Sequence, residues 1–560
     1  MATKIPKIIQ GGMGVQVSSW ELAREVARAG ELGVISGTAM DMVLLRWMQD
    51  GDPGGLYRRA LSHFPDQGMV KRFMDKYYVE GGKDKNKPYK PLQMWQLNPG
   101  QELQEACVLG NFAEVWLAKH GDDNSLVDGV VGINCLTKIQ LPTIESLYGA
   151  MLADVDYVLM GAGIPMEVPG ILDRLAANED AKLSIDIDGG DPIKHVFSPK
   201  AFWAASGHPE LAEKKLKRPN FLPIVSSVTL AQAMLKRATG AGPTKGIQGF
   251  IIELPSAGGH NAPPRGFRYD AVQKSHKLSL NERGEPVYGP KDDIDLPKFK
   301  QAVGDLPFWL AGYYARPEKL NDVLALGGAG IQVGTSFAFT KESGLAPEPK
   351  QVVLQRVSQG DLRVFTDPVA SPTGFPFKVL ELEGSLSDKD KYLARPRVCN
   401  LGYLRTPYMR DDGKVGYRCA SEPVDEWVKK GGDLAATEGR KCLCNSLMAN
   451  AGLPQVSPFK KEGESERYIE EILITAGDDI NQIRRYMKQN KDGEYEYSAK
   501  DVIDYLLGRF KEEYNDELKL YQDAHMAEDG NVRDELMSKK KDLQNKIADV
   551  DEQRAGLAGK

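Results

Sequence analysis

Cysteine is scarce in this sequence, with six residues in 560. So few thiols in so long a chain do not form a disulfide scaffold, and they are more typical of free thiols or metal ligands in a reducing compartment. Long apolar runs are also missing, because no stretch approaches the roughly 20 residues that a membrane-spanning helix needs. The formal net charge of −6 lacks the positive excess of a nucleic-acid-binding protein. The sequence begins without the apolar segment and cleavage site of a signal peptide. We therefore expect a cytoplasmic protein with no membrane or nucleic-acid partner.

What the chain does have is a regular alternation of strand-like and helix-like segments. Such alternation indicates a parallel sheet with crossover helices. Eight strand candidates stand at residues 7–12, 32–36, 130–135, 156–163, 221–227, 249–254, 308–313 and 329–337.

The glycine pattern decides between two parallel architectures. Gly12 and Gly14 resemble the start of a dinucleotide fingerprint, but Val17 stands where a third glycine is needed. The second strand ends in Ser36 and Gly37, without an acidic residue to hold a ribose. A doubly wound sheet is thus disfavoured, and we predict an α/β fold, a TIM (β/α)8 barrel. Its βα loops would carry large insertions at about residues 38–128, 188–219 and 261–306, on the active-site face.

Three regions are expected along the chain. Residues 1–365 form the barrel with its insertions, 366–455 a cysteine-containing irregular segment, and 456–560 a helical C-terminal region. A heptad-like spacing in the last region predicts a short coiled coil, through which a homo-oligomer could form, or else an amphipathic helix that packs on the body. The residues with this spacing are Leu536, Leu543, Ile547, Val550 and Leu557.

The run ELPSAGGH at residues 253–260 is the most informative motif. It ends a strand with two glycines and His260, which places a titratable side chain at the mouth of the barrel. Gly312, and Gly334 with Thr335, follow the last two strands, where barrels commonly bind phosphate. Glycine allows backbone N–H groups to approach an anion closely. These features suggest a phosphate-bearing cofactor with a histidine beside it.

Four of the six cysteines lie in the segment 366–455. Four thiolates can hold zinc or an iron–sulfur cluster, although the spacing here is not that of paired C-x-x-C motifs. Reduced, partly buried thiols without metal are the alternative. The candidate ligands are Cys399, Cys419, Cys442 and Cys444.

The motifs together resemble the nitronate monooxygenase family, formerly called 2-nitropropane dioxygenases, and the related flavin-dependent enoyl-acyl-carrier-protein reductases. The resemblance spans roughly residues 5–344, interrupted by the insertions. It is carried by IIQGGM at 8–13, GIN at 132–134, AGGH at 257–260 and GIQVGT at 330–335. Asn261 after the histidine, and Tyr313 after Gly312, depart from the family pattern.

The resemblance implies a barrel that binds FMN non-covalently and oxidises alkyl nitronates with dioxygen to a carbonyl compound and nitrite. His260 would be the catalytic residue; at a near-neutral pKa it could accept a proton from a nitroalkane or hydrogen-bond the anionic substrate. The cofactor-binding residues would be Gly12, Met13, Asn134, Ser226, Glu253, Gly258, Gly259, Gly312, Gln332, Gly334 and Thr335.

Two other functions stay open. One is NAD(P)H-dependent reduction of an enoyl thioester in fatty acid or polyketide synthesis. The other is a non-catalytic flavin-binding or assembly module.

Overall fold

Eight parallel strands close into a barrel in the computed structural model, which describes residues 5–237, 246–265, 268–270, 275–461, 464–509 and 537–539. Around the barrel their order is β1, β12, β11, β8, β7, β4, β3, β2. Each lies within or overlaps one of the eight predicted segments, so the predicted TIM barrel is confirmed. The barrel strands are β1 (Ile8–Gln10), β2 (Leu32–Ser36), β3 (Val130–Leu136), β4 (Tyr157–Gly161), β7 (Asn220–Val225), β8 (Phe250–Glu253), β11 (Phe308–Ala311) and β12 (Gly330–Val333).

Alternate side chains of these strands fill the barrel interior. Ile9, Val34, Leu222 and Ile251 are fully buried there, and Trp309 closes the amino-terminal end by donating its indole N–H to the Pro6 carbonyl at 2.9 Å. Such a packed interior leaves the loops at the strand ends as the place for chemistry.

Helices surround the barrel, and one glycine fixes how closely the first of them approaches. A Cβ atom at Gly33 would lie 1.9 Å from the carbonyl oxygen of Ala23, so only glycine permits this contact between α1 and β2. The helices that connect barrel strands or follow the last one are α1 (Trp20–Arg28), α6 (Thr143–Leu152), α7 (Val168–Ala176), α9 (Val228–Arg237), α11 (Pro317–Ala325), α12 (Thr335–Ala338) and α13 (Pro347–Gln359).

The three long interruptions carry secondary structure of their own. The first holds α2 (Met40–Gln49), η1 (Pro53–Gly55), α3 (Leu56–Leu61), α4 (Gln67–Tyr77) and α5 (Gln101–Lys119). The second begins in the turn between β5 (Ala181–Ile185) and β6 (Ile193–Phe197) and also holds α8 (Pro199–Ser206) and η2 (Pro209–Ala212). The third holds β9 (Arg268–Asp270), β10 (Ser275–Lys277) and α10 (Leu296–Val303).

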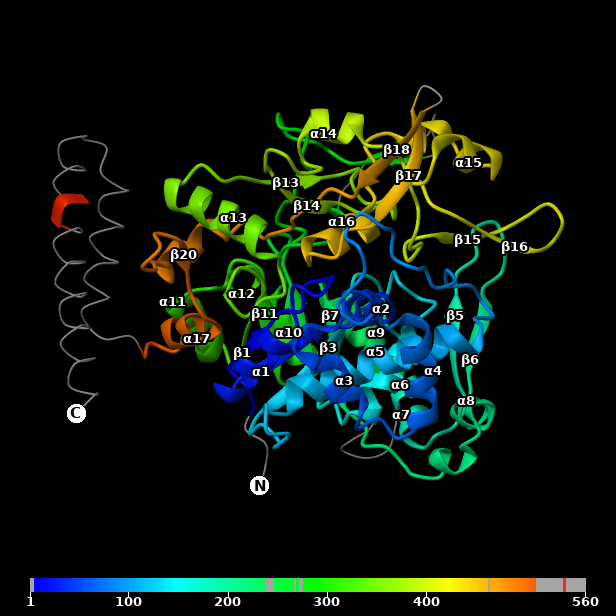
Figure 1. Cartoon of the computed structure of the whole chain (residues 1–560). Helices are drawn as coiled ribbons and strands as arrows, with labels where there is room; N and C mark the ends of the chain where they lie inside the picture. Colours follow the sequence, from blue (N-terminus) through cyan, green and yellow to red (C-terminus); the bar gives the residue numbers. More distant parts are fainter. Residues whose placement is uncertain are drawn as a thin grey trace. The chain divides into compact units, whose positions relative to one another are not determined.

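The chain after the barrel is a series of hairpins and short helices. It contains β13 (Val364–Asp367), β14 (Phe377–Leu380), α14 (Lys389–Ala394), β15 (Thr406–Met409), β16 (Val415–Arg418), α15 (Val424–Lys429), η3 (Leu434–Thr437), α16 (Leu443–Asn450), β17 (Val456–Lys461), β18 (Glu464–Ile469), η4 (Ile480–Arg485), β19 (Lys488–Gln489), β20 (Tyr495–Glu496) and α17 (Ala499–Leu506). In Figure 1, β14, α16, β17 and β18 lie together above the barrel strands. We call residues 364–500 the C-terminal region.

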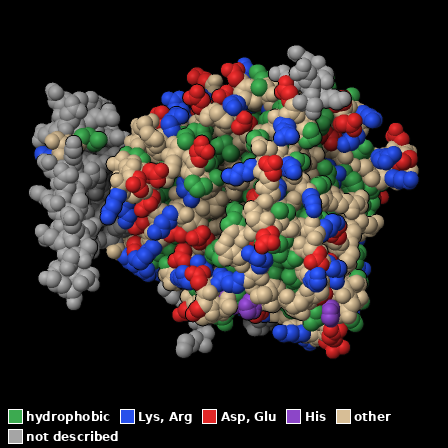
Figure 2. Space-filling model, in the orientation of Figure 1, with side chains coloured by type: hydrophobic (Ala, Val, Ile, Leu, Met, Phe, Trp, Pro, Cys, Tyr) green, Lys and Arg blue, Asp and Glu red, His purple; other side chains and the backbone are tan. Residues whose placement is uncertain are grey.

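Two compact units divide the chain, Met1–Lys500 and Asp501–Lys560. The first unit thus contains both the barrel and the C-terminal region. In the second, only residues 501–509 and 537–539 are described, and the predicted heptad positions lie outside them. None of the described helices is long and apolar enough to cross a membrane. On the face drawn in Figure 2, acidic and basic side chains are interspersed without a patch of one sign.

Candidate active site at the mouth of the barrel

A cavity of about 1350 Å³, part of it open to solvent, lies at the carboxyl ends of the barrel strands. Every barrel strand contributes to its wall at or near its carboxyl end, as is usual for an active site in this fold. The lining positions from the barrel are 11–15, 38–39, 134, 136, 139, 161–162, 224, 253, 257–260, 311–315 and 332–335.

All the predicted catalytic and cofactor positions except Ser226 line this cavity. They are Gly12, Met13, Asn134, Glu253, Gly258, Gly259, His260, Gly312, Gln332, Gly334 and Thr335. Ser226 lines a smaller neighbouring pocket, where the Arg265 guanidinium donates to its carbonyl oxygen. The short motifs of the sequence therefore converge on one space, while the roles of the individual residues stay predictions.

Glycine is present in the turns after β11 and β12 for different reasons. Gly312 has a φ of +97°, a conformation that favours glycine, and a Cβ there would lie 2.8 Å from Ser256 Oγ. Gly334 has an ordinary φ of −105°, and the atom nearest to a Cβ there would be Met13 Sδ at 3.3 Å. Glycine at 334 thus leaves space for a group that approaches the backbone. We call these two turns the phosphate turns, after the role that the sequence predicts for them.

Two buried amide oxygens at the cavity have no hydrogen-bond partner among the described residues. Asn134 donates its Nδ2 to the Gly12 carbonyl at 3.1 Å, which leaves Oδ1 without a donor, and Gln332 Oε1 is in the same state. Because buried polar atoms normally have partners, these oxygens indicate a ligand that carries N–H or O–H donors. FMN has such donors on its ring and ribityl chain, so the residues present fit this cofactor.

His260 is held as a neutral imidazole. Its Nε2 lies 2.7 Å from Ser371 Oγ, and its ring contacts Phe377 edge-on at a centroid distance of 4.9 Å. Burial lowers the pKa of His260 to about 3, with a smaller contribution from the positive charge of Lys138. The near-neutral pKa expected from the sequence is therefore wrong, because the C-terminal region covers the ring. A neutral imidazole can still form hydrogen bonds to a substrate.

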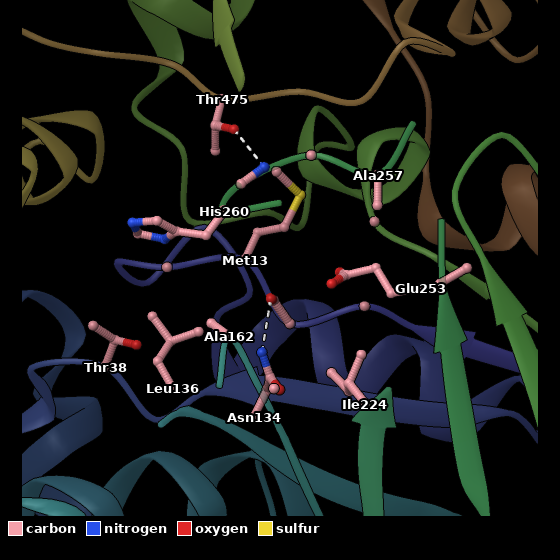
Figure 3. Close-up of a pocket in the computed structure, with 18 of the residues that line it drawn as sticks. Met13, Thr38, Asn134, Leu136, Ala162, Ile224, Glu253, Ala257, His260 and Thr475 are labelled. Atoms are coloured by element: carbon pink, nitrogen blue, oxygen red, sulfur yellow. Dashed lines mark hydrogen bonds between the residues drawn. The ribbon is translucent and has the colours of Figure 1, made fainter. Parts of the chain in front are cut away.

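Glu253 of the cavity is coupled electrostatically to Lys138, which stands between the lining residues Leu136 and Ile139. In Figure 3 the Glu253 carboxyl group and the Met13 side chain point into the space above Asn134. Burial raises the pKa of Glu253 to about 7, and the charge of Lys138 opposes this rise. Burial also lowers the pKa of Lys138 to about 7, and Glu253 opposes that. The sequence analysis did not predict a role for Lys138, which stands out in the sequence only as a basic residue just after the end of a barrel strand.

The C-terminal region closes the cavity and holds the glycine–histidine turn. Thr475 Oγ1 accepts a hydrogen bond from Gly259 N at 2.8 Å (Figure 3), and Lys378 N donates to the Gly259 carbonyl at 2.9 Å. Tyr403 lines the cavity and donates its hydroxyl to buried Asp41 of α2 at 2.5 Å. Leu404, Leu443 and Leu447 add an apolar wall. The residues that the C-terminal region contributes to these contacts do not belong to the motifs found in the sequence.

A carboxyl group lies beside the second phosphate turn. Asp479 lines the cavity and hydrogen-bonds to Thr335, which also accepts from Gly477 N at 2.9 Å. Burial raises the pKa of Asp479 to about 6, and the hydrogen bond with Thr335 opposes the rise. An ionised carboxylate here would repel any anion that approaches this turn.

The predicted metal site is contradicted. All six cysteines are free thiols, and Cys399, Cys419, Cys442 and Cys444 surround a small space near Glu422. Even so, in the described part of the chain no three His, Cys, Asp or Glu side chains are placed to hold a metal ion. Burial raises the pKa of Cys399, Cys419 and Cys442 to about 12, so these groups are neutral thiols rather than thiolates.

Comparison of the sequence with protein-family models and with curated proteins gives no match. Comparison with solved structures gives FabK from Thermotoga maritima, with 15% identity over 92% of this chain and 96% of that one and a TM-score of 0.39. Nitroalkane oxidase from Streptomyces ansochromogenes is 17% identical over 90% of this chain and 97% of that one, with a TM-score of 0.37.

A third similar structure is the enoyl reductase domain of MlnA from the macrolactin biosynthesis cluster of Bacillus amyloliquefaciens. It is 11% identical over 98% of this chain and 97% of that one, with a TM-score of 0.40. Similarities of this extent assign no function to this chain, whose fold rests on the strand pairing described above.

Proposed function

We propose that this protein is an FMN-dependent oxidoreductase, a monooxygenase that oxidises alkyl nitronates, or similar small carbon acids, with dioxygen. The main supporting observation is that one cavity joins two glycine turns, two amide oxygens without a partner among the described residues, and a neutral histidine. This combination supports a phosphate at one end and a polar ring near the centre. FMN would supply the electron transfer when bound.

The chain's own groups would bind and orient the substrate. His260, fixed through Ser371, would offer a neutral hydrogen-bonding group beside the ring of the cofactor. Glu253, which lines the cavity, would titrate near neutral pH, so it could hold or release a proton there. Because a nitronate is already ionised, its oxidation needs no strong base, which agrees with the low pKa of His260.

A second candidate is NAD(P)H-dependent reduction of an enoyl thioester. It is favoured by the apolar side of the cavity, where Leu136, Ile139, Leu404, Leu443 and Leu447 offer space for an acyl chain. Either reaction would use the same FMN site.

An anaerobic visible spectrum of the purified protein tests both candidates. Flavin bands near roughly 370 and 450 nm that bleach with an alkyl nitronate alone would support the monooxygenase. Bleaching with NADPH alone would support the reductase. Bound flavin that neither compound reduces would favour a non-catalytic module. A colourless protein that also fails to bind added FMN would contradict the proposal.

A further inference from the structure

We propose that Ser371 of the C-terminal region is a positioning residue for His260. Its hydroxyl donates to Nε2 of the imidazole and so places the single ring proton on Nδ1, the nitrogen that a ligand in the cavity can reach. The inference rests on the function proposed above and deepens it, because it says which ring atom meets the substrate and in which form. Ser371 is fully buried in the loop between β13 and β14.

The two ring nitrogens of His260 have different surroundings. Nε2 lies 2.7 Å from Ser371 Oγ. Nδ1 forms no hydrogen bond with the described residues, and it is not enclosed as the unpartnered oxygens of Asn134 and Gln332 are. Since His260 lines the cavity, Nδ1 is the ring nitrogen that is available to a ligand.

The other partners of Ser371 indicate which atom donates to which. The backbone N–H of Thr373 donates to Ser371 Oγ at 3.3 Å, and the two hydroxyl oxygens lie 2.8 Å apart. Thr373 Oγ1 has no further hydrogen-bond partner among the described residues. If Thr373 donates to Ser371, and Ser371 donates to Nε2, each hydroxyl hydrogen has an acceptor. The reverse order would leave the Thr373 hydroxyl hydrogen without a described acceptor, so the first order is favoured.

This order fixes the tautomer of His260. Burial keeps the pKa of His260 far below neutral pH, so the ring carries one proton. A neutral imidazole has one N–H donor and one acceptor nitrogen, and the hydrogen bond at one nitrogen decides which is which. With Nε2 accepting from Ser371, the proton lies on Nδ1.

The backbone at His260 is held separately from its ring. His260 pairs with Phe377 in an antiparallel β-bridge, and Asn261 N donates to the Pro376 carbonyl at 3.0 Å. Loss of the Ser371 hydroxyl would therefore free the tautomer without freeing the turn that carries the histidine.

An Nδ1–H donor suits both candidate reactions. The oxygens of a nitronate carry the negative charge, and in enoyl thioester reduction negative charge develops on the thioester oxygen. A donor directed at such an oxygen stabilises this charge, whereas an unprotonated Nδ1 would turn its lone pair toward it. The fixed tautomer thus explains how a histidine that stays neutral at physiological pH can act on an anion.

The first test is solid-state NMR of the ring nitrogens in the FMN-treated protein with isotopically labelled histidine. Protonated and unprotonated nitrogens give well-separated signals, and His260→Asn identifies those of His260 by their loss. We expect the wild-type ring to carry its proton on Nδ1, and Ser371→Ala to show the Nε2–H tautomer, alone or mixed with the first. A wild-type ring with its proton on Nε2 would overturn the inference.

The second test is turnover, with ethyl nitronate and dioxygen or with NADPH and crotonyl coenzyme A, whichever pair the wild type accepts. Ser371→Ala should lower turnover about tenfold, with FMN affinity unchanged, because the donor is no longer fixed. Ser371→Thr keeps a hydroxyl and should stay within a few-fold of wild type. A Ser371→Ala variant with the tautomer and turnover of wild type would contradict the proposed role.

Ser385→Ala is the matched control. Ser385 is equally buried, its hydroxyl oxygen lies 2.8 Å from that of Ser387, and the Ser387 N–H donates to it at 3.2 Å. This repeats the arrangement of Ser371 and Thr373, but Ser385 donates to the Leu382 carbonyl at 2.8 Å instead of a histidine. The control should keep the tautomer and the turnover of wild type. An equal loss of turnover in the two alanine variants would reveal a general effect on the C-terminal region and refute the positioning role.

Failure of the proposed function is separate from failure of this inference. It is seen in wild type alone, as absent flavin or flavin that neither nitronate nor NADPH reduces. The tautomer of His260 is measured without any turnover. Should Ser371→Ala unfold, as seen in thermal melts, the wild-type spectrum still decides on which nitrogen the proton lies.

Discussion

The barrel and the C-terminal region contribute to the same cavity in different ways. The barrel supplies mostly backbone and small residues, such as the turns at Gly312 and Gly334, together with a few polar side chains from strand ends. The C-terminal region supplies side chains that enclose these groups, among them Ser371, Thr475 and Asp479. The difference teaches that the backbone geometry of the cavity is encoded by short local motifs, whereas its electrostatics are set by residues far away in the sequence.

The largest expected effect comes from a variant that tests the contribution of the barrel to FMN binding. Gly334→Glu places bulk and negative charge against the expected phosphate, and FMN affinity should fall by about 100-fold or more. Gly334→Ala is the matched control, since its φ suits alanine and the added Cβ meets only the flexible end of Met13. Fluorescence titration with FMN measures both; equal affinity in the Glu variant would remove Gly334 from the cofactor site.

Next in size is a variant that separates catalysis from cofactor binding. His260→Asn should lower turnover by about 100-fold while FMN stays bound, because the imidazole is a wall of the cavity rather than a support of the phosphate turns. Since the pKa of His260 is about 3, its titration should leave no inflection in the pH profile above about pH 5. Unchanged turnover with flavin bound would exclude His260 from the mechanism.

A smaller effect, of opposite sign, tests the C-terminal side. Asp479 carries a charge above its pKa of about 6, so its repulsion of the phosphate should grow as the pH rises through that value. Asp479→Asn should then bind FMN about tenfold more tightly than wild type at alkaline pH, with the two converging at acid pH. The FMN phosphate titrates in both proteins, so the difference between them is the measurement. A constant ratio across pH would contradict this role.

The smallest expected effect is none at all. Because the described cysteines form no metal-binding group, treatment with a chelator should leave the melting temperature unchanged. Elemental analysis should find less than about 0.1 zinc or iron per chain, a small part of what a structural site requires. Stoichiometric zinc or iron would show that the cysteines hold a metal ion after all.

The same division between local and distant residues explains what the sequence could predict. All eight barrel strands were recognisable, because each is a short apolar run bounded by helices and turns. His260 and the glycine turns were found for the same reason. The pKa of His260 could not be predicted, since it depends on burial of the ring, which contacts Ser371 and Phe377, and on the charge of Lys138.

Clustering along the chain also misled the interpretation of the cysteines. Cys442 and Cys444 are separated by one residue and line the same small space. Among the described residues, however, they do not form a group that could hold a metal ion. Lys138 and Asp479 carry no motif and gain their meaning only from the fold. Residues of this kind can be found only when the fold shows which groups surround them.

Asp479 stands near the end of the first compact unit and still touches the turn after the last barrel strand. During synthesis, therefore, all eight strands leave the ribosome well before the groups that will cover their mouth. During that interval the carboxyl ends of the barrel strands would be exposed to water. A cofactor bound at this stage would be enclosed as the C-terminal region folds. A cofactor that binds later would have to enter the cavity after the C-terminal region has covered it.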